Sequence, residues 1–129
     1  MNPRDGRRSP CGVADAKARL HDSEAFLEVA QSAQDADVVA TNAIHSAIAA
    51  ADAVCCITLR ERSVDGNHAA AIQLLSRVDT NLSAALKRAL DRKTQAAYES
   101  RDISASDARV CVRQAVLLVA AARDRLLGT

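Results

Sequence analysis

Aromatic residues are nearly missing from this chain of 129 residues, which has no Trp, one Tyr and one Phe. Hydrophobic residues still make up 49% of the sequence, so most of them are Ala, Leu, Val and Ile. Strands favour β-branched and aromatic side chains that alternate with polar ones, and no stretch of the sequence alternates in that way. The composition therefore predicts closely packed helices in one domain of ordinary size.

The chain also lacks an excess of charge and a long apolar run. Its formal net charge of +1 gives no overall field that would draw it to nucleic acid or to an anionic membrane, so any such contact must be local. We find no run approaching the roughly 18 apolar residues that span a bilayer, and the N-terminal sequence MNPRDGRRSP lacks the apolar core of a signal peptide. We therefore expect a cytoplasmic protein with no membrane contact.

Cysteine spacing that would bind zinc or carry redox chemistry is missing too. The four cysteines include no Cys-x-x-Cys pair, and no second ligand follows His68 at helical spacing. We expect Cys55, Cys56 and Cys111 to be small packing residues of helices, with incidental oxidation or reactivity as the alternative. The sequence thus predicts no metal site and no cofactor.

Residues 1–12 carry two prolines, two glycines and three arginines, and bury too little apolar surface to hold a fixed shape. We expect a flexible tail there, followed by a helical domain over residues 13–129. An arm that contacts nucleic acid is the alternative role for Arg4, Arg7 and Arg8.

Hydrophobic periodicity predicts five helices in the domain. The expected ranges are 13–31, 36–59, a short helix capped by Asn67 that ends near residue 77, 82–98, and a last helix from residue 104 to Gly128. The helix over 36–59 contains no Gly or Pro and many alanines, so neighbouring helices can approach it closely on several sides. It is the expected centre of the bundle.

The last two predicted helices have distinct surfaces. Ser104 and Asp107 form a capping-box sequence, and the helix that follows is apolar all round over residues 115–122. We expect a homodimer to bury the face that one small bundle leaves uncovered. The helix over 82–98 should bury Leu82, Ala85, Leu86, Ala89, Leu90 and Ala97. Its other face holds Lys87, Arg88, Arg92 and Lys93, which predicts either a solvated surface or contact with phosphates.

Three segments carry a family resemblance. Residues 90–104, LDRKTQAAYESRDIS, resemble the pattern of HEPN domains in which a basic residue precedes a short helical step and an A-[HD]-Y tripeptide. The runs AIAAAD (47–52) and NHAAAI (67–72) are similar to small actinobacterial HEPN-like proteins. The resemblance covers residues 14–127 and implies an all-α, antiparallel four- to five-helix bundle.

The resemblance also bears on catalysis. Ribonucleases of the family use an Arg followed after four to six residues by a His, brought together across a dimer groove. Arg92 falls at the Arg position and Tyr98 at the tyrosine, but Ala97 stands where the His would be. A methyl group cannot transfer a proton, and loss of a general acid or base typically removes about 10²–10⁴ of rate. We therefore expect no catalytic residue and lean against an enzyme.

The leading hypothesis is a non-catalytic or weakly active HEPN-like homodimer in bacterial stress or defence, which binds RNA, a nucleotide or a protein partner. Its expected phosphate-binding residues are Arg88, Arg92, Lys93, Tyr98 and Arg101, with Tyr98 either stacking on a base or sealing the end of the bundle. One alternative is a toxin-like, metal-independent endoribonuclease, and another is a purely structural interaction bundle. The resemblance implies a nucleotidyltransferase-type antitoxin as a possible partner protein.

Overall fold

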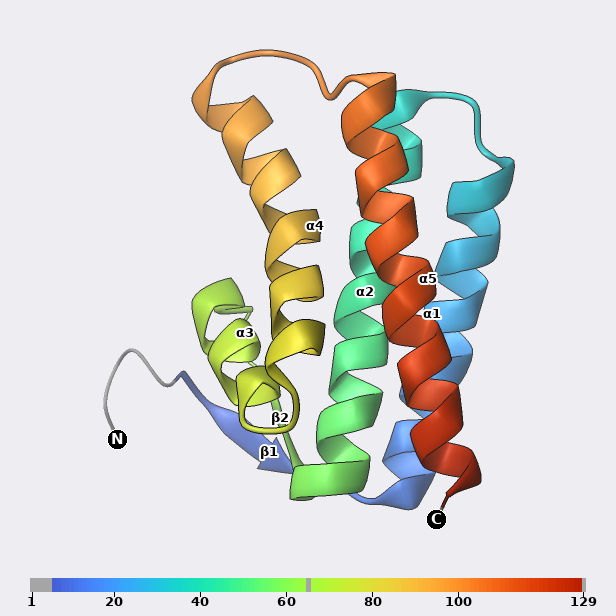
Figure 1. Ribbon diagram of the computed structural model, residues 1–129, viewed down its shortest axis with the longest axis vertical. Coiled ribbons are helices and arrows are strands. Elements are labelled where there is room, and N and C mark those ends of the chain that lie inside the picture. The colour runs from blue at the N-terminus through green and yellow to red at the C-terminus, as the bar shows by residue number, and fades with distance from the viewer. Residues whose placement is uncertain (1–5, 65, 129) are drawn as a thin grey trace.

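Five helices and one short strand pair make up the part of the chain that the computed structural model describes, residues 6–64 and 66–128 (Figure 1). In chain order the elements are β1 (Arg8–Pro10), α1 (Val13–Ser32), α2 (Ala36–Leu59), β2 (Glu61–Ser63), α3 (His68–Ser76), α4 (Thr80–Tyr98) and α5 (Ala105–Leu127). The long helices α1, α2, α4 and α5 alternate in direction and pack side by side, and α3 packs against α4 near its start. The expected all-α class is confirmed.

Local capping fixes where the helices begin. The Asp35 carboxylate accepts hydrogen bonds from the backbone N–H groups of Asp37 and Val38, at 3.0 and 3.1 Å, and α2 starts directly after it. Asn67 caps α3 as predicted, through the N–H of Ala70 at 3.0 Å. Each cap satisfies N–H groups that have no partner inside the helix, so these boundaries can be found from sequence.

The centre of the bundle is α2, whose alanines at 40, 43, 47, 49, 50 and 53 are completely buried. Because these side chains are single methyl groups, α1 and α5 approach α2 closely along much of its length. By length and composition α2 is also apolar enough to cross a membrane, so the expectation that no segment reaches this threshold is wrong. Within the fold, 72% of that apolar window is buried by the rest of the protein.

A two-stranded antiparallel ribbon lies at the end of the bundle where α2 stops. Arg8 lies opposite Ser63 and Pro10 opposite Glu61, and the N–H of Cys11 donates to the carbonyl of Arg60 at 2.9 Å. The expected flexible tail is therefore wrong for residues 8–11, and residues 1–5 lie outside the described part. The expected absence of strands is wrong here as well, because a ribbon of three residues per strand is too short to show an alternating pattern.

The ribbon brings Cys11 beside the last turns of α2, where it forms a disulfide with Cys56. Cys56 is therefore not the simple packing residue that we expected. Cys55 and Cys111 are buried thiols, as predicted. Burial raises the pKa of Cys55 to about 12 and that of Cys111 to about 11, so both stay protonated near neutral pH and are poor nucleophiles.

The buried side of α4 agrees with the prediction except at one position. Leu82, Ala85, Leu86, Ala89 and Leu90 are buried, but Ala97 is exposed and Ala96 is buried in its place. Ala96 follows the buried Ala89 by seven residues and Ala97 follows the buried Leu90 by seven, close to two full turns in each case, but at the end of α4 only the Ala96 side stays covered. Ala97 thereby faces a groove described below.

Candidate ligand-binding groove

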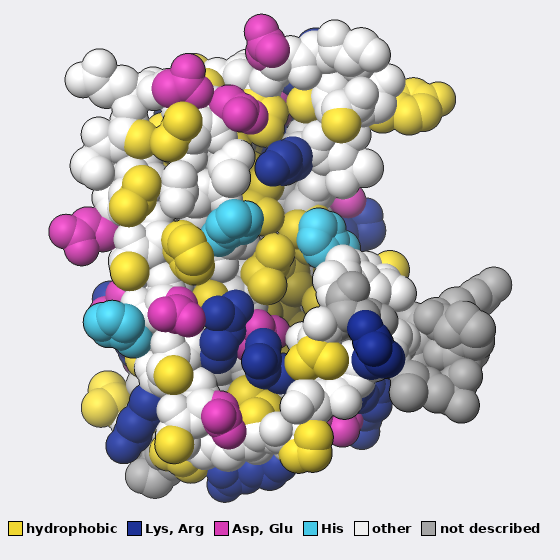
Figure 2. Space-filling view, turned by 180° about the vertical axis from the view of Figure 1, so that it is seen from behind, with side chains coloured by type: hydrophobic (Ala, Val, Ile, Leu, Met, Phe, Trp, Pro, Cys, Tyr) yellow, Lys and Arg dark blue, Asp and Glu magenta, His cyan; other side chains and the backbone are white. Residues whose placement is uncertain are grey.

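A groove of about 380 Å³ runs between α2 and α4. Figure 2 looks onto the face of the molecule opposite to that in Figure 1 and shows a hollow with hydrophobic side chains on its floor and a histidine on either side. The residues that line the groove are Ile44, His45, Ile48, His68, Leu90, Lys93, Thr94 and Ala97. A concave apolar surface with a few polar groups at its edge is the usual form of a small-molecule site.

Three elements contribute to this groove, and each has a local reason to be there. Ile44 and Ile48 are one helical turn apart on α2, so they share the face that looks toward α4. His68 is the first residue of α3 and enters the groove because Asn67 caps that helix. Leu90 and Ala97 are two turns apart on α4 and form the opposite wall.

His45 lies exposed on the α2 side of the groove. Its ring is 5.2 Å from the ring of Phe26 on α1, in an edge-to-face arrangement with an interplanar angle of 77°. This contact limits the orientations of the imidazole.

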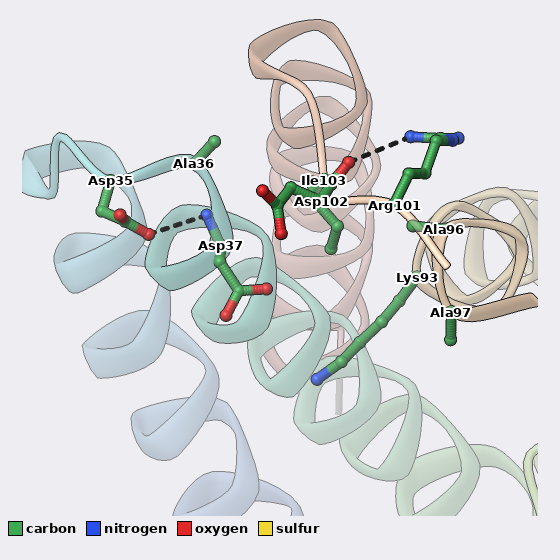
Figure 3. Close-up of a pocket in the computed structure, with 9 residues that line it drawn as sticks. All are labelled: Asp35, Ala36, Asp37, Lys93, Ala96, Ala97, Arg101, Asp102 and Ile103. Carbon is green, nitrogen blue, oxygen red and sulfur yellow. Dashed lines mark hydrogen bonds between the residues drawn. The ribbon is translucent and has the colours of Figure 1, made fainter. Parts of the chain in front are cut away.

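Lys93 provides a cation at the upper end of the groove. Figure 3 shows its side chain reaching from α4 toward the first turns of α2. No carboxylate among the described residues lies within the 4 Å of an ion pair with its ammonium group. Lys93 can therefore bind an anionic ligand without first breaking an ion pair.

Beyond Lys93 the groove meets a second cavity, of about 540 Å³, between the α1–α2 turn and the α4–α5 loop (Figure 3). Lys93 and Ala97 line both cavities. Asp35, Asp37 and Asp102 surround the second cavity, and Asp35 is already used as the cap of α2. An anion is therefore favoured on the groove side of Lys93 and disfavoured on the carboxylate side.

At its lower end the groove continues into a smaller hollow of about 150 Å³ that holds a buried ion cluster. Asp52 is only 7% exposed, and its Oδ2 lies 3.0 Å from Nη2 of Arg19 and 3.5 Å from Nη1 of Arg62. Burial raises the pKa of Asp52, and the two guanidinium groups oppose that shift. Nη1 of Arg19 also lies 3.1 Å from Oδ2 of Asp22, so two carboxylates face the two guanidinium groups, and the cluster ties α1 and β2 to α2.

Two residues of the predicted phosphate site are engaged elsewhere. Arg101 donates to Asp107 at 2.8 Å and to Glu99 at 2.6 Å, and Nη1 of Arg92 lies 3.6 Å from Asp107. The hydrogen bond from Arg101 lowers the pKa of Asp107 and also lowers that of Glu99. These arginines therefore hold the corner between α4 and α5.

The remaining predicted residues do not complete a shared site. Arg88 is exposed on α4, and Tyr98 is 89% exposed at the end of that helix, so it does not seal the bundle. Of the five residues predicted to bind phosphate, only Lys93 lines the groove. Sequence reasoning missed the contribution of His45 and His68 because residues 23 positions apart meet only through the turn between α2 and α3.

The described residues contain no group of three or more His, Cys, Asp or Glu side chains placed to hold a metal ion.

Comparison with known proteins adds no relative to this description. No protein-family model matches the chain, and no significant match is found among curated proteins or among solved structures.

Proposed function

We propose that this chain is a HEPN-like helical binding protein without a catalytic role, and that its groove takes a small ligand with an apolar planar body and an anionic group. A nucleotide has this chemistry. The observation that carries the proposal is the groove itself, with the aliphatic side chains of Ile44, Ile48 and Leu90 along it and the unpaired ammonium of Lys93 at one end. In the proposed complex, the base of the nucleotide covers these aliphatic side chains and its phosphate lies beside Lys93.

A nucleotide suits the groove better than an RNA strand does. The groove volume of about 380 Å³ lies within the range of about 300–1,000 Å³ common for small-molecule sites. An RNA strand needs a row of cations along its phosphate backbone. Arg92 and Arg101 cannot supply that row, because both are paired with Asp107. Under this proposal the protein acts in bacterial stress or defence as a nucleotide-responsive partner of other molecules, with a nucleotidyltransferase-type protein as the proposed partner.

A metal-independent endoribonuclease is the second candidate, and one observation favours it. His45 and His68 line the same groove as Lys93, and two imidazoles with a cation can supply acid, base and charge stabilisation for phosphodiester cleavage. They would replace the family's histidine, whose position is Ala97. Arg92, which falls at the arginine position of the family's motif, lies beside Asp107.

Titration of the purified protein with adenosine 5′-monophosphate, adenosine and inorganic phosphate, followed by NMR or calorimetry, tests the proposal. We expect the nucleotide to bind more tightly than either fragment. Lys93→Ala should weaken nucleotide binding about tenfold, the loss of one charge-assisted contact, while Arg88→Ala should leave it unchanged. The matched control removes an exposed cation from the same helix.

Failure of the nucleotide to bind, or equal effects of the two variants, would overturn the proposal. Incubation with labelled RNA in a chelator separates the second candidate. Cleavage that His45→Ala or His68→Ala abolishes would replace the binding function with the endoribonuclease. If no ligand binds and no RNA is cleaved, a purely structural interaction bundle is the better account.

We also propose that the protein functions as a homodimer in the cytoplasm. The support for the dimer is the outer surface of α5, where Val116 and Leu117 are 43% and 45% exposed. Large aliphatic side chains on a solvent face favour association.

A further inference from the structure

The outward face of α5 carries a regular stripe of six residues. Its members follow one another at alternating spacings of three and four, which is the seam of a two-helix coiled coil. They are Val110, Arg113, Leu117, Ala120, Asp124 and Leu127. Val110 is half-buried and the other five are exposed, with Leu127 at 85%. The inner face of α5, with Ala115, Leu118 and Ala122, is buried against the rest of the bundle, so the stripe has no partner within the described chain.

This stripe is complementary to itself when one copy is reversed. Antiparallel alignment about the point between residues 118 and 119 places Arg113 opposite Asp124 of the second copy. The same register places Leu117 opposite Ala120 and Val110 opposite Leu127. Every position thus meets a residue of matching chemistry, and the two-fold symmetry repeats each pair.

We propose that a second copy of this chain packs antiparallel along this stripe, so that α5 pairs with α5 through two Arg113–Asp124 ion pairs around an aliphatic centre. The inference rests on the proposed homodimer and gives it an interface and a register. A parallel arrangement would set Arg113 against Arg113 and Asp124 against Asp124, and like charges directly opposite are destabilising. The pattern therefore selects one orientation.

Two further observations support a second copy as the occupant. Within the described part of the chain, neither Arg113 nor Asp124 has an ion-pair partner within 4 Å, although the neighbouring Arg123 is paired with Glu24 at 3.2 Å. The stripe extends over about 26 Å at 1.5 Å per residue, long enough for six layers of side chains, in which each of the three pairs occurs twice. A single helix pair falls near the lower limit of specific interfaces, so we expect a dimer with a dissociation constant in the micromolar range.

Sedimentation of charge-reversed variants tests the register. The wild-type protein at about 100 µM, above the expected micromolar dissociation constant, should sediment at twice its monomer mass of 13.7 kDa. Arg113→Asp and Asp124→Arg should each be monomeric, because each sets two pairs of like charges in the interface. The double variant should recover the dimer, because it restores both pairs with their signs exchanged.

Arg88→Asp is the matched control, since it makes the same substitution at an exposed position of α4. It should remain dimeric, and far-UV circular dichroism should show equal helix content in all variants. A monomeric wild type, dimeric single variants or a monomeric double variant would each overturn the inference. The groove lies on α2, α3 and α4, so none of these variants should change nucleotide binding. Loss of the dimer can therefore be distinguished from failure of the proposed ligand site.

Discussion

Asp107 joins three roles in one carboxylate at the start of α5. It accepts from Arg101 at 2.8 Å, lies 3.6 Å from Arg92, and completes a capping box in which its own N–H donates to the Ser104 hydroxyl at 3.0 Å. The capping box could be predicted from the local sequence. The pairing of both arginines with the same carboxylate could not, because it depends on how α4 and α5 meet, and this is why two of the expected phosphate ligands are structural.

Replacement of Asp107 by Asn should lower the free energy of unfolding at neutral pH by about 1 kcal/mol, the combined loss of a partly exposed ion pair and half a capping box. The folded-state pKa of Asp107 lies below its ordinary value, so its stabilising contribution is complete above the unfolded-state pKa near 4 and is lost as the pH falls through the folded-state pKa. Urea unfolding of wild type and variant from pH 7 to pH 2 measures this difference.

Asp102→Asn is the control, because Asp102 is exposed in the same loop and its side chain caps no helix. The difference between wild type and Asp107→Asn should begin to shrink below about pH 4, where the carboxyl of the unfolded chain becomes protonated, and should be lost once the pH has fallen through the lower folded-state pKa. A difference that is constant across the pH range would show that Asp107 acts through shape and not through charge.

At the scale of elements, most of the fold could be predicted because most of its signals are local. The caps at Asn67 and Ser104 could be predicted from the local sequence, and the alanine-rich sequence of α2 indicated a helix enclosed by others. Ala97 follows the buried Leu90 by two turns, so the local pattern predicts that it is buried, but at that end of α4 the same face lines the groove. The strand pair and the Cys11–Cys56 disulfide could not be predicted, because they join residues about 45 to 55 positions apart through pairing that leaves no periodic pattern.

The alanines of α2 should tolerate no enlargement. Ala50→Leu should lower the free energy of unfolding by about 1–3 kcal/mol, because the position is completely buried and three added carbon atoms must displace a neighbouring helix. Ala18→Leu, at an exposed position of α1, should change stability by no more than about 0.5 kcal/mol. Urea unfolding followed by far-UV circular dichroism compares them, and equal effects would contradict the close packing of α2.

For the whole molecule, the disulfide joins the N-terminal ribbon to the helix at the centre of the bundle. Cys11 and Cys56 are 45 residues apart, so their bond restricts a long loop of the unfolded chain. We expect Cys11→Ser, or reduction of the wild type, to lower the free energy of unfolding by about 2–4 kcal/mol. Urea unfolding with and without reductant measures this, and Cys11→Ser should not respond to the reductant.

A wild type that does not respond to reductant would contradict the structural role of this bond.

The redox state of Cys11 and Cys56 also tests the expected cytoplasmic location. Disulfides persist mainly in oxidising compartments, so a protein that resides in the cytoplasm should yield reduced Cys11 and Cys56 when thiols are labelled before lysis. Blocked thiols would instead indicate an oxidising compartment.

The groove is a property of the assembled molecule rather than of any one segment. Its lining comes from α2, α3 and α4, and the two histidines belong to helices joined through the ribbon strand β2. Sequence reasoning could identify Lys93 as part of a basic helix, but not that it would stand over aliphatic side chains from α2. That juxtaposition requires the crossing of two helices, which no local pattern specifies.

The exposed position of Tyr98 decides how this protein can be observed by optical methods. With no Trp and one Tyr in the chain, ultraviolet emission comes from a phenol ring that is already in water in the native state. Tyrosine emission should therefore stay nearly constant when the core unfolds, and would instead report on anything that docks at the end of α4.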